Sequence, residues 1–359
     1  MLLINILLLI IISIFKSKSK FVANVLLSIL ALTAIYNTNL PDMSIYESRF
    51  NFYQQMSSYS EFGFTQLIHF FHLLGIDFFW FRAFIIVAYL LTIRWFVLKH
   101  TQHCAFVISL YAIFSYCLDV VQLRNSLAMI FVIYGIDALI TDKSKYTVLK
   151  FVLAIIVATS MHFSSIFYIV LLATRYFSIA KTWIVFAWST AIMSILFLSK
   201  DWLMKIFTLV ISQDRIYMIL DFASRYQFSR VVNFQLGTIF CSLLIFFLLF
   251  LSRNVIKKAS NTTNQGFACI DCIAKCQILS LIAIPLLFVS VDMYRIPRNM
   301  LWLGYVGFIP NMINVKNVNQ ITESMFNKLL MLGVALVIFL IQIYGMGNFN
   351  DVFIPLFFN

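Results

Sequence analysis

The stretch "SYCLDVVQLRNSLAMIFVIYGIDALI", residues 115–140, joins polar side chains to an apolar run long enough to enter a membrane. Residues 125–140 are mostly apolar, and they follow closely on Asp119, Gln122 and Arg124. Because a charged side chain at the centre of a bilayer costs at least ~2.5 kcal/mol, Arg124 is expected at the membrane boundary. The stretch therefore predicts a helix that begins among polar groups and then crosses the hydrocarbon.

Apolar runs of this kind recur along the whole chain. Of its 359 residues, 62% are hydrophobic and 11% are charged, whereas a soluble domain is about half apolar and about a quarter charged. The runs do not alternate as the strands of a transmembrane β-barrel do. We therefore expect an all-α polytopic membrane protein, a single transmembrane domain over residues 1–359 with about 12 spanning helices. The apolar segments are residues 1–15, 21–36, 76–98, 103–118, 125–140, 147–161, 164–180, 182–199, 233–252, 276–291, 299–313 and 329–346.

Basic residues mark one side of the membrane. Alternate connections between the apolar segments hold 16 of the 26 Lys and Arg residues but only three acids. Cytoplasmic connections are enriched in Lys and Arg, so these connections are expected in the cytoplasm and both chain termini outside it. The first apolar segment precedes its lysines, the reverse of a signal peptide, and is expected to be retained. The basic connections are residues 16–20, 94–100, 142–150, 175–181 and 253–258, with Lys275, Lys316 and Lys328.

The other side carries arginine instead of lysine. Eight of its ten basic residues are arginine, whereas 13 of the 16 cytoplasmic ones are lysine. Guanidinium holds phosphate or carboxylate through two parallel hydrogen bonds, and topology alone does not account for basic residues on this side. The arginines therefore predict an anionic ligand at the extracytoplasmic boundary. They are Arg49, Arg82, Arg124, Arg215, Arg225, Arg230, Arg295 and Arg298.

Two extracytoplasmic segments are amphipathic rather than spanning. The first loop, residues 37–75, contains an amphipathic interfacial helix near residues 62–74, whose helical spacing puts Glu61 and His72 on one polar stripe. The second, an extracytoplasmic loop near residues 200–232, places aromatic residues among charges. A loop of that length between spans is often a lid or binding loop, and we expect it to cover the anion site.

Three arginines are the candidate anion ligands. Arg124 either pairs with Asp119 and fixes a helix turn, or contacts a phosphate group. In "SVDMYRIPRNM", Pro297 can begin a helix and so leave Arg295 and Arg298 at its N-terminal end, where the helix dipole also favours anions. The alternative for these two is anchoring at the membrane interface. Phosphate binding is preferred because so many arginines share this side.

Acid–base candidates lie on the same side. His162, in "ATSMHFSS", is expected at a turn between two spans, where an imidazole that titrates near neutral pH can take a proton from a sugar hydroxyl. A single histidine among apolar residues is otherwise a structural residue. Asp42, Tyr46 and Glu61 of the first loop supply a base or bind saccharide hydroxyls, unless they are simply solvated.

Metal and nucleic-acid chemistry find no support in the sequence. Cys269, Cys272 and Cys276 form C-x2-C-x3-C, but no second Cys or His cluster accompanies them. The sequence holds no glycine-rich phosphate loop, and the net charge of +12 follows from membrane topology. We therefore expect neither a metal ion nor a cofactor, and no nucleic acid as a partner.

The order of several short motifs resembles one family. The motifs are D-x-x-x-Y (Asp42 and Tyr46), E-x-G-F beginning at Glu61, "LRNSLAM" at residues 123–129, "MHFSS" at residues 161–165, and the later "YRIPRNMLWLGY" and "NDVFIPLFF". The chain is thereby similar to the EpsG/Wzy-like membrane proteins of bacterial exopolysaccharide, capsule and O-antigen assembly, and the likeness extends over most of its length.

The resemblance implies a GT-C-like bundle in the bacterial inner membrane that acts as a metal-independent glycosyltransferase. Such an enzyme polymerises undecaprenyl-diphosphate-linked oligosaccharide repeat units at the extracytoplasmic face. Its partners would be the lipid-linked donor and acceptor, membrane lipids and a chain-length regulator.

The resemblance also assigns roles to the candidate residues. The expected diphosphate ligands are Arg124, Arg295 and Arg298. The expected base for the acceptor hydroxyl is His162 first, then Glu61 or Asp42. The expected glycan contacts are Tyr46, Arg225, Tyr226 and Tyr294.

Two other functions fit a polytopic membrane protein. A flippase or transporter of lipid-linked glycan would place charges along a path through the midplane, whereas here they collect at one surface. A membrane acyltransferase would need a histidine–acid pair near the cytoplasm, and neither His100 nor His103 has an acid close by in sequence. Glycosyl transfer is preferred, with the flippase as the alternative.

Overall fold

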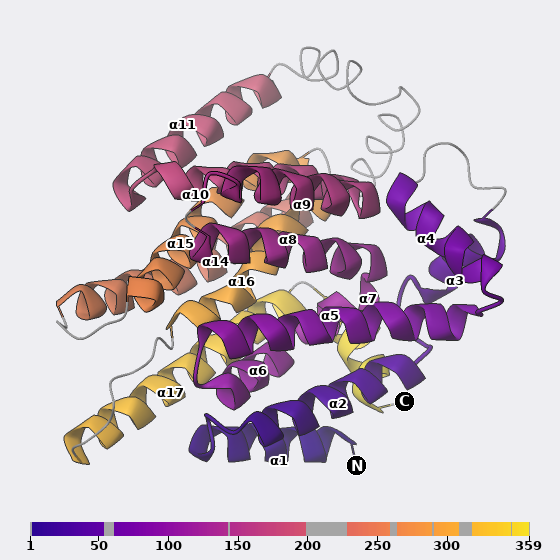
Figure 1. Ribbon diagram of the computed structural model, residues 1–359, viewed down its shortest axis with the longest axis horizontal. Coiled ribbons are helices and arrows are strands. Elements are labelled where there is room, and N and C mark those ends of the chain that lie inside the picture. The colour runs from indigo at the N-terminus through magenta and orange to yellow at the C-terminus, as the bar shows by residue number, and fades with distance from the viewer. Residues whose placement is uncertain are drawn as a thin grey trace.

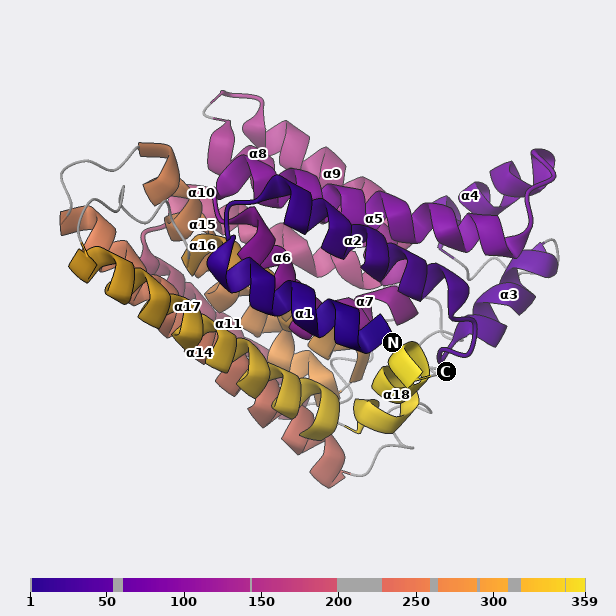
Figure 2. The ribbon, with the colours of Figure 1, turned by 90° about the horizontal axis from the view of Figure 1, so that it is seen from below.

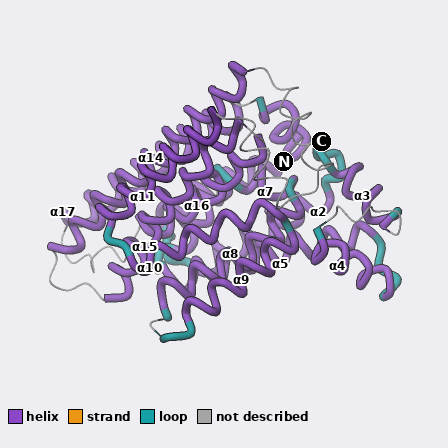
Figure 3. Tube along the Cα trace, turned by 90° about the horizontal axis from the view of Figure 1, so that it is seen from above, coloured by secondary structure: helices purple, strands orange, loops and turns teal. Residues whose placement is uncertain are grey.

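Helices account for nearly all of the chain that the structure describes. The computed structural model describes residues 2–53, 61–142, 144–198, 228–258, 264–288, 291–308, 318–345 and 347–358. This part of the chain contains no strand, and Figure 3 shows short connections between its helices. The expected all-α class is confirmed.

The helices divide between the two halves of the chain. The first half contains α1 (Leu2–Phe15), α2 (Lys20–Tyr36), α3 (Met43–Asn51), α4 (Phe62–Leu73), α5 (Phe78–His100), α6 (Cys104–Ile113), α7 (Tyr116–Val121), α8 (Leu123–Thr141), α9 (Thr147–Met161), η2 (Phe163–Leu172), α10 (Ala173–Tyr176) and α11 (Ile179–Leu198). The second half contains α14 (Phe228–Lys258), α15 (Asn264–Ser280), η3 (Leu281–Phe288), η4 (Val291–Tyr294), α16 (Arg295–Phe308), α17 (Val318–Phe339), η5 (Leu340–Gly345), η6 (Phe349–Phe353) and α18 (Ile354–Phe358).

The long helices run side by side as a bundle (Figure 1). α8 packs between α5 and α9, and α15 packs against α14 and α16. The most apolar 18 residues within Leu123–Thr141 (α8) and within Gly266–Ile284 (mostly α15) are 72% and 78% buried, so these two helices form the centre of the bundle. α8 begins at Leu123, which confirms the predicted helix start beside Arg124.

The chain is a multi-pass membrane protein. Five described helices are long and apolar enough to cross a membrane, and six shorter apolar helices overlap other predicted segments. A seventh, Phe349–Phe358, lies outside the predicted segments. Large apolar side chains such as Phe21 and Trp188 are 77% and 67% exposed, as contact with lipid requires. The five are Phe78–His100, Leu123–Thr141, Leu236–Asn254, Gly266–Ile284 and Met325–Gly345. The total of about twelve crossings and the GT-C-like arrangement stay predictions.

Lysines gather at one end of the described bundle, together with Arg94, Arg175 and Arg253, and five other arginines lie at the opposite end. At one end, Lys328 Nζ donates to the Ile14 carbonyl at 2.9 Å and Lys275 Nζ to the Thr174 carbonyl at 3.2 Å, so connections far apart in sequence meet there. We call it the lysine-rich end, formed by residues 16–20, 99–103, 142, 144–150, 175–181, 253–258 and 264–275 with Lys328. The opposite, arginine-rich end carries Arg49, Arg82, Arg124, Arg295 and Arg298. α1 begins and α18 ends on this side (Figures 1 and 2).

α3 and α4 lie at the arginine-rich end, beside the start of α5 (Figures 1 and 2). α4 covers almost the predicted range and buries Phe64 and Phe71, whose rings meet Phe81 of α5. α3 was expected as part of a loop, although its buried Tyr46 and Phe50 have helical spacing. The placement of both helices at the membrane interface stays a prediction.

Candidate active site at the arginine-rich end

Arg124 and Glu61 form an ion pair at this end. Arg124 is the second residue of α8, and Glu61 directly precedes α4. Arg124 Nη1 donates to Glu61 Oε2 at 2.7 Å, and the two side chains are 20% and 13% exposed. A pair with Asp119 was the alternative to the preferred phosphate contact, but the acid that Arg124 binds is Glu61, 63 residues away. Arg124 Nε is buried without a hydrogen-bond partner in the described part of the chain, so the guanidinium keeps an unused donor.

Glu61 also lies beside His162, in the turn between α9 and η2. His162 Nδ1 is 3.4 Å from Glu61 Oε1. Because an ionised carboxylate only accepts hydrogen bonds, Nδ1 carries the proton and Nε2 keeps its lone pair. Nε2 is buried and makes no hydrogen bond to any described residue. An acid-bound imidazole with a free acceptor nitrogen has the arrangement of a general base.

Gly63 allows this contact to form. A Cβ atom at this position would lie 2.4 Å from Ser160 Oγ and 3.1 Å from Met161 Cε. The missing side chain therefore lets α4 approach α9 closely, which brings Glu61 to His162. The glycine of the E-x-G-F motif is therefore required for the close packing of α4 against α9.

The charges around the pair determine its protonation state. Burial alone would raise the pKa of Glu61, but the hydrogen bond to His162 and the charge of Arg124 hold that pKa well below its ordinary value. Burial is also the largest influence on His162 and lowers its pKa. Glu61 opposes this effect, while the charges of Arg295 and Arg124 add to it. Near neutral pH the pair is therefore a carboxylate and a neutral imidazole.

α3 brings further residues close to Arg124. The guanidinium carbon of Arg124 lies 5.9 Å from the centre of the buried Tyr46 ring, within cation–π range. Burial lowers the pKa of Arg49, and the charge of Arg124 lowers it further, so the two cations repel each other. An anionic ligand would relieve this repulsion. Asp42 lies at the exposed start of α3 with a φ of 64°, and its charge also acts on Arg49.

Arg295 joins the same group from another helix. It is the first residue of α16, it is half-buried, and its charge acts on the imidazole of His162. Pro297 is the third residue of α16, so the predicted helix start near this proline is confirmed. Arg124 and Arg295 therefore both bring positive charge to His162, from α8 and α16.

Arg298 is enclosed by protein. Its side chain is fully buried, and Nη2 donates to Gln122 Oε1 at 2.9 Å and to Asn299 Oδ1 at 3.0 Å. Nη1 lies 3.3 Å from the Tyr294 hydroxyl, and Asp119 Oδ1 lies 3.6 Å from Nη2. A diphosphate contact by Arg298 stays a prediction, because it would require an exchange of these bonds.

A buried polar network that the sequence did not predict surrounds Arg298. Asp119 accepts hydrogen bonds from Tyr89 at 2.9 Å and from Tyr111 at 3.2 Å. Asn299 Nδ2 donates to Asn125 Oδ1 at 2.9 Å, which joins α16 to α8. Asp119 and Tyr89 each stand alone among apolar residues in the sequence, and a single polar side chain in an apolar segment is a signal of buried polar contacts.

The remaining predicted contacts are described only in part. Arg225, Tyr226 and most of the loop near residues 200–232 lie outside the described residues, so the expected lid stays a prediction. Tyr294 is buried, with its ring centre 5.3 Å from the guanidinium carbon of Arg298. Its glycan contact also stays a prediction.

The groups available for chemistry at this end are guanidinium, carboxylate, imidazole and phenol. Across the described ranges, no three His, Cys, Asp or Glu side chains gather as metal ligands do. The six cysteines are buried free thiols. Those of C-x2-C-x3-C lie on α15, where Cys272 Sγ contacts Thr174 Oγ1 at 3.8 Å.

Comparison with known proteins assigns the chain to a family. No curated protein and no solved structure matches it. A family model, described as the EpsG family, matches residues 20–358, from the start of α2 to α18. The match includes Glu61, Arg124, His162 and Arg295, and the family is associated with exopolysaccharide polymerisation. With nearly the whole chain covered, the protein belongs to the EpsG family.

Proposed function

We propose that the protein polymerises undecaprenyl-diphosphate-linked oligosaccharide repeat units into an extracellular or capsular polysaccharide. Membership of the EpsG family supports polysaccharide polymerisation, and the lipid-linked substrate is our inference from the charges. The observation that carries it is the group of Arg124, Arg295, Glu61 and a neutral His162 at one end of a membrane bundle. A polyprenyl diphosphate needs cations at the membrane boundary, beside hydrocarbon for its tail and water for its glycan.

The arginines bind the diphosphate in this scheme. Negative charge develops on the diphosphate as the glycosidic bond breaks, and fixed guanidinium groups stabilise that charge. Arg124 is already oriented by Glu61 and lies over Tyr46, so it needs little reorganisation. Arg295 supplies a second cation, and Arg49 a third.

His162 is the proposed base. The acceptor hydroxyl gives its proton to Nε2 while its oxygen bonds to the anomeric carbon of the donor sugar. The bond from that carbon to the diphosphate oxygen breaks, and undecaprenyl diphosphate leaves with the bonding electron pair. Glu61 holds Nδ1 and stabilises the imidazolium that forms. Because its own pKa is far below the ordinary value, Glu61 is a weak proton acceptor.

Replacement of Arg124 tests the proposal, and the molecule offers a matched control. At the lysine-rich end, Arg253 Nε donates to Asp271 Oδ1 at 2.7 Å, with side chains 21% and 18% exposed, much like the pair of Arg124 and Glu61. In the native strain, Arg124→Ala should abolish long polymer and leave single lipid-linked repeat units on the extracytoplasmic side. Arg253→Ala should leave polymer length unchanged.

Two outcomes would contradict the proposal. Unchanged polymer in Arg124→Ala would remove the arginine from the reaction. Accumulation of repeat units on the cytoplasmic side would indicate export of the lipid-linked glycan instead of its polymerisation.

A further inference from the structure

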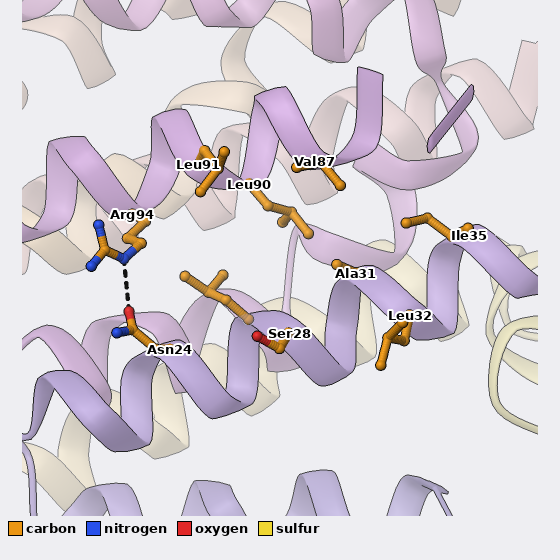
Figure 4. Close-up of a pocket in the computed structure, with 10 residues that line it drawn as sticks. Asn24, Ser28, Ala31, Leu32, Ile35, Val87, Leu90, Leu91 and Arg94 are labelled. Atoms are coloured by element: carbon orange, nitrogen blue, oxygen red, sulfur yellow. Dashed lines mark hydrogen bonds between the residues drawn. The ribbon is translucent and has the colours of Figure 1, made fainter. Parts of the chain in front are cut away.

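A groove between α2 and α5 opens on the outer surface of the bundle (Figure 4). Its cavity has a volume of about 410 Å³. The side chains along most of its length are apolar, among them Leu32 of α2 and Leu91 of α5. These two are 52% and 56% exposed. In a membrane protein, such a groove faces lipid rather than water.

One end of the groove is charged. Arg94 Nε donates to Asn24 Oδ1 at 2.7 Å, and Figure 4 shows both terminal guanidinium nitrogens turned away from Asn24. This partner is an uncharged amide, so it does not neutralise Arg94. Lys20 precedes Asn24 by one helical turn and lies on the same face of α2. The charged end of the groove therefore lies on the lysine-rich side of the membrane.

The length of the groove matches one leaflet. From Asn24 to Ile35, α2 rises about 16 Å at 1.5 Å per residue, which is about half of the ~30 Å hydrocarbon thickness. Ile35 and Val87 line the groove at the end away from Arg94 (Figure 4). An apolar slot of this length that starts at a guanidinium group fits an acyl chain with an anionic headgroup.

We propose that this groove is a binding site for an anionic glycerophospholipid of the leaflet at the lysine-rich end. An acyl chain fills the slot between α2 and α5, and the phosphate accepts hydrogen bonds from the terminal nitrogens of Arg94. Lys20 adds a second positive charge near the headgroup. The site is separate from the proposed glycosyl transfer, so either conclusion can fail without the other.

Binding at this site should stabilise the fold. α5 also binds α2 at the other end of their contact, where Arg82 Nη2 donates to the carbonyls of Ala34 and Asn37. A lipid in the groove connects the same two helices at the lysine-rich end. Because a ligand that binds only the folded state raises its stability, the lipid should raise the melting temperature.

The test uses purified full-length protein in detergent, with phosphatidylglycerol and phosphatidylcholine of identical acyl chains as probes. Native mass spectrometry measures binding, and thermal melting measures stabilisation. We expect phosphatidylglycerol to bind about tenfold more tightly, the ratio given by ~1.4 kcal/mol. Arg94→Gln should remove this preference and Arg94→Lys should keep part of it. Ala31→Leu, which fills the slot, should weaken both lipids, and Lys181→Gln, an exposed control at the same end, should change neither.

Three results would overturn the proposal. The first is equal binding of the two lipids to the unmodified protein. The second is an unchanged preference in an Arg94→Gln protein that melts cooperatively, with Ala31→Leu also unchanged. The third is displacement of phosphatidylglycerol by an equal amount of undecaprenyl phosphate, which would assign the groove to a polyprenyl chain.

Discussion

Each end of the bundle holds an acid between a cation and a histidine, but the two clusters differ in what surrounds them. At the lysine-rich end, Asp137 accepts from Lys99 Nζ at 2.7 Å and lies 2.8 Å from His100 Nε2. At the arginine-rich end, Glu61 is placed likewise between Arg124 and His162. The arginine-rich cluster has additional cations, Arg49 and Arg295, and its histidine has a nitrogen free to accept a proton.

Among the described residues, the cluster of Asp137 contains no further cation, whereas the cluster of Glu61 has additional positive charge that can bind an anionic ligand. Elsewhere at the lysine-rich end, acids pair with some of the cations, such as Lys150 with Asp142 at 2.6 Å and Lys275 with Asp271 at 2.6 Å, whereas Arg94 has an uncharged amide as its partner. At the other end, Glu61 is shared by a cluster with more positive than negative charge. An anion completes the contacts around Glu61. It is not needed by the cluster of Asp137, Lys99 and His100, none of which lines the groove at Arg94.

The largest expected effect is a difference in polymerisation rate between substitutions of the two histidines. His162→Ala should reduce polymerisation by about 10²–10⁴-fold, the usual contribution of a general base. His100→Ala should leave the turnover of the folded protein unchanged. The measurement is the rate of polymer formation from lipid-linked repeat units in proteoliposomes. Equal losses in the two variants would mean that His162 has only a structural role.

The next effect concerns stability at the buried network. Arg298→Met leaves the buried Asp119 without its cation, which should cost about 3–5 kcal/mol. The melting temperature should fall clearly, while Lys150→Gln, at an exposed pair, should hardly change it. A small shift for Arg298→Met would contradict the structural role of Arg298 and would favour the sequence-based prediction of a diphosphate contact.

Exchange of lysine and arginine in the two ion pairs tests whether the arginine-rich end needs a guanidinium group or only a positive charge. Arg124→Lys keeps the charge but loses the planar fork that binds phosphate through two donors, so polymerisation should fall about tenfold to a hundredfold. Lys99→Arg should leave the rate of polymerisation unchanged, because Lys99 contacts Asp137 and Trp95 at the opposite end of the bundle and an arginine keeps its charge. Steady-state rates of both variants check this, and full activity in Arg124→Lys would show that charge alone suffices.

The smallest effect is a shift in the pH profile. A base must be neutral, and the lowered pKa of His162 means that activity persists below the ordinary value of 6.5 and is lost as the pH falls through the lowered pKa. Glu61→Gln removes a charge that favours imidazolium, so the acid limb should move to lower pH. Arg295→Gln removes a charge that disfavours it, so the limb should move to higher pH. The measurement is kcat/KM as a function of pH for both variants. A shift of both acid limbs in the same direction would contradict the assignment of His162 as the base.

The pattern of the sequence was sufficient to predict most of the fold. Apolar runs and helix-start residues predicted the spanning segments, the start of α8 beside Arg124 and the short α4, because these depend on local composition. Contacts of Lys328 with Ile14 and of Lys275 with Thr174 bring several of the alternate lysine-rich connections together at one end, and their position in the cytoplasm stays a prediction. The helix α3 was missed, because three buried residues among polar ones give a weak periodic signal.

The partners within the site could not be predicted in the same way. Arg124 and Glu61 are 63 residues apart, and Glu61 and His162 are 101 apart, so the contact depends on how α4 packs against α9. The same limit applies to Asp137, whose partners Lys99 and His100 lie 38 and 37 residues away. It also explains why the sequence offered no acid for His100.

A double substitution in proteoliposomes tests the central claim most directly. If Glu61 acts by orienting His162, the rates of polymer formation for Glu61→Gln, His162→Gln and the double variant should not be additive. We expect the double variant to be about as slow as His162→Gln alone. A double variant whose loss equals the product of the two single losses would show that Glu61 and His162 act independently, and would contradict the account.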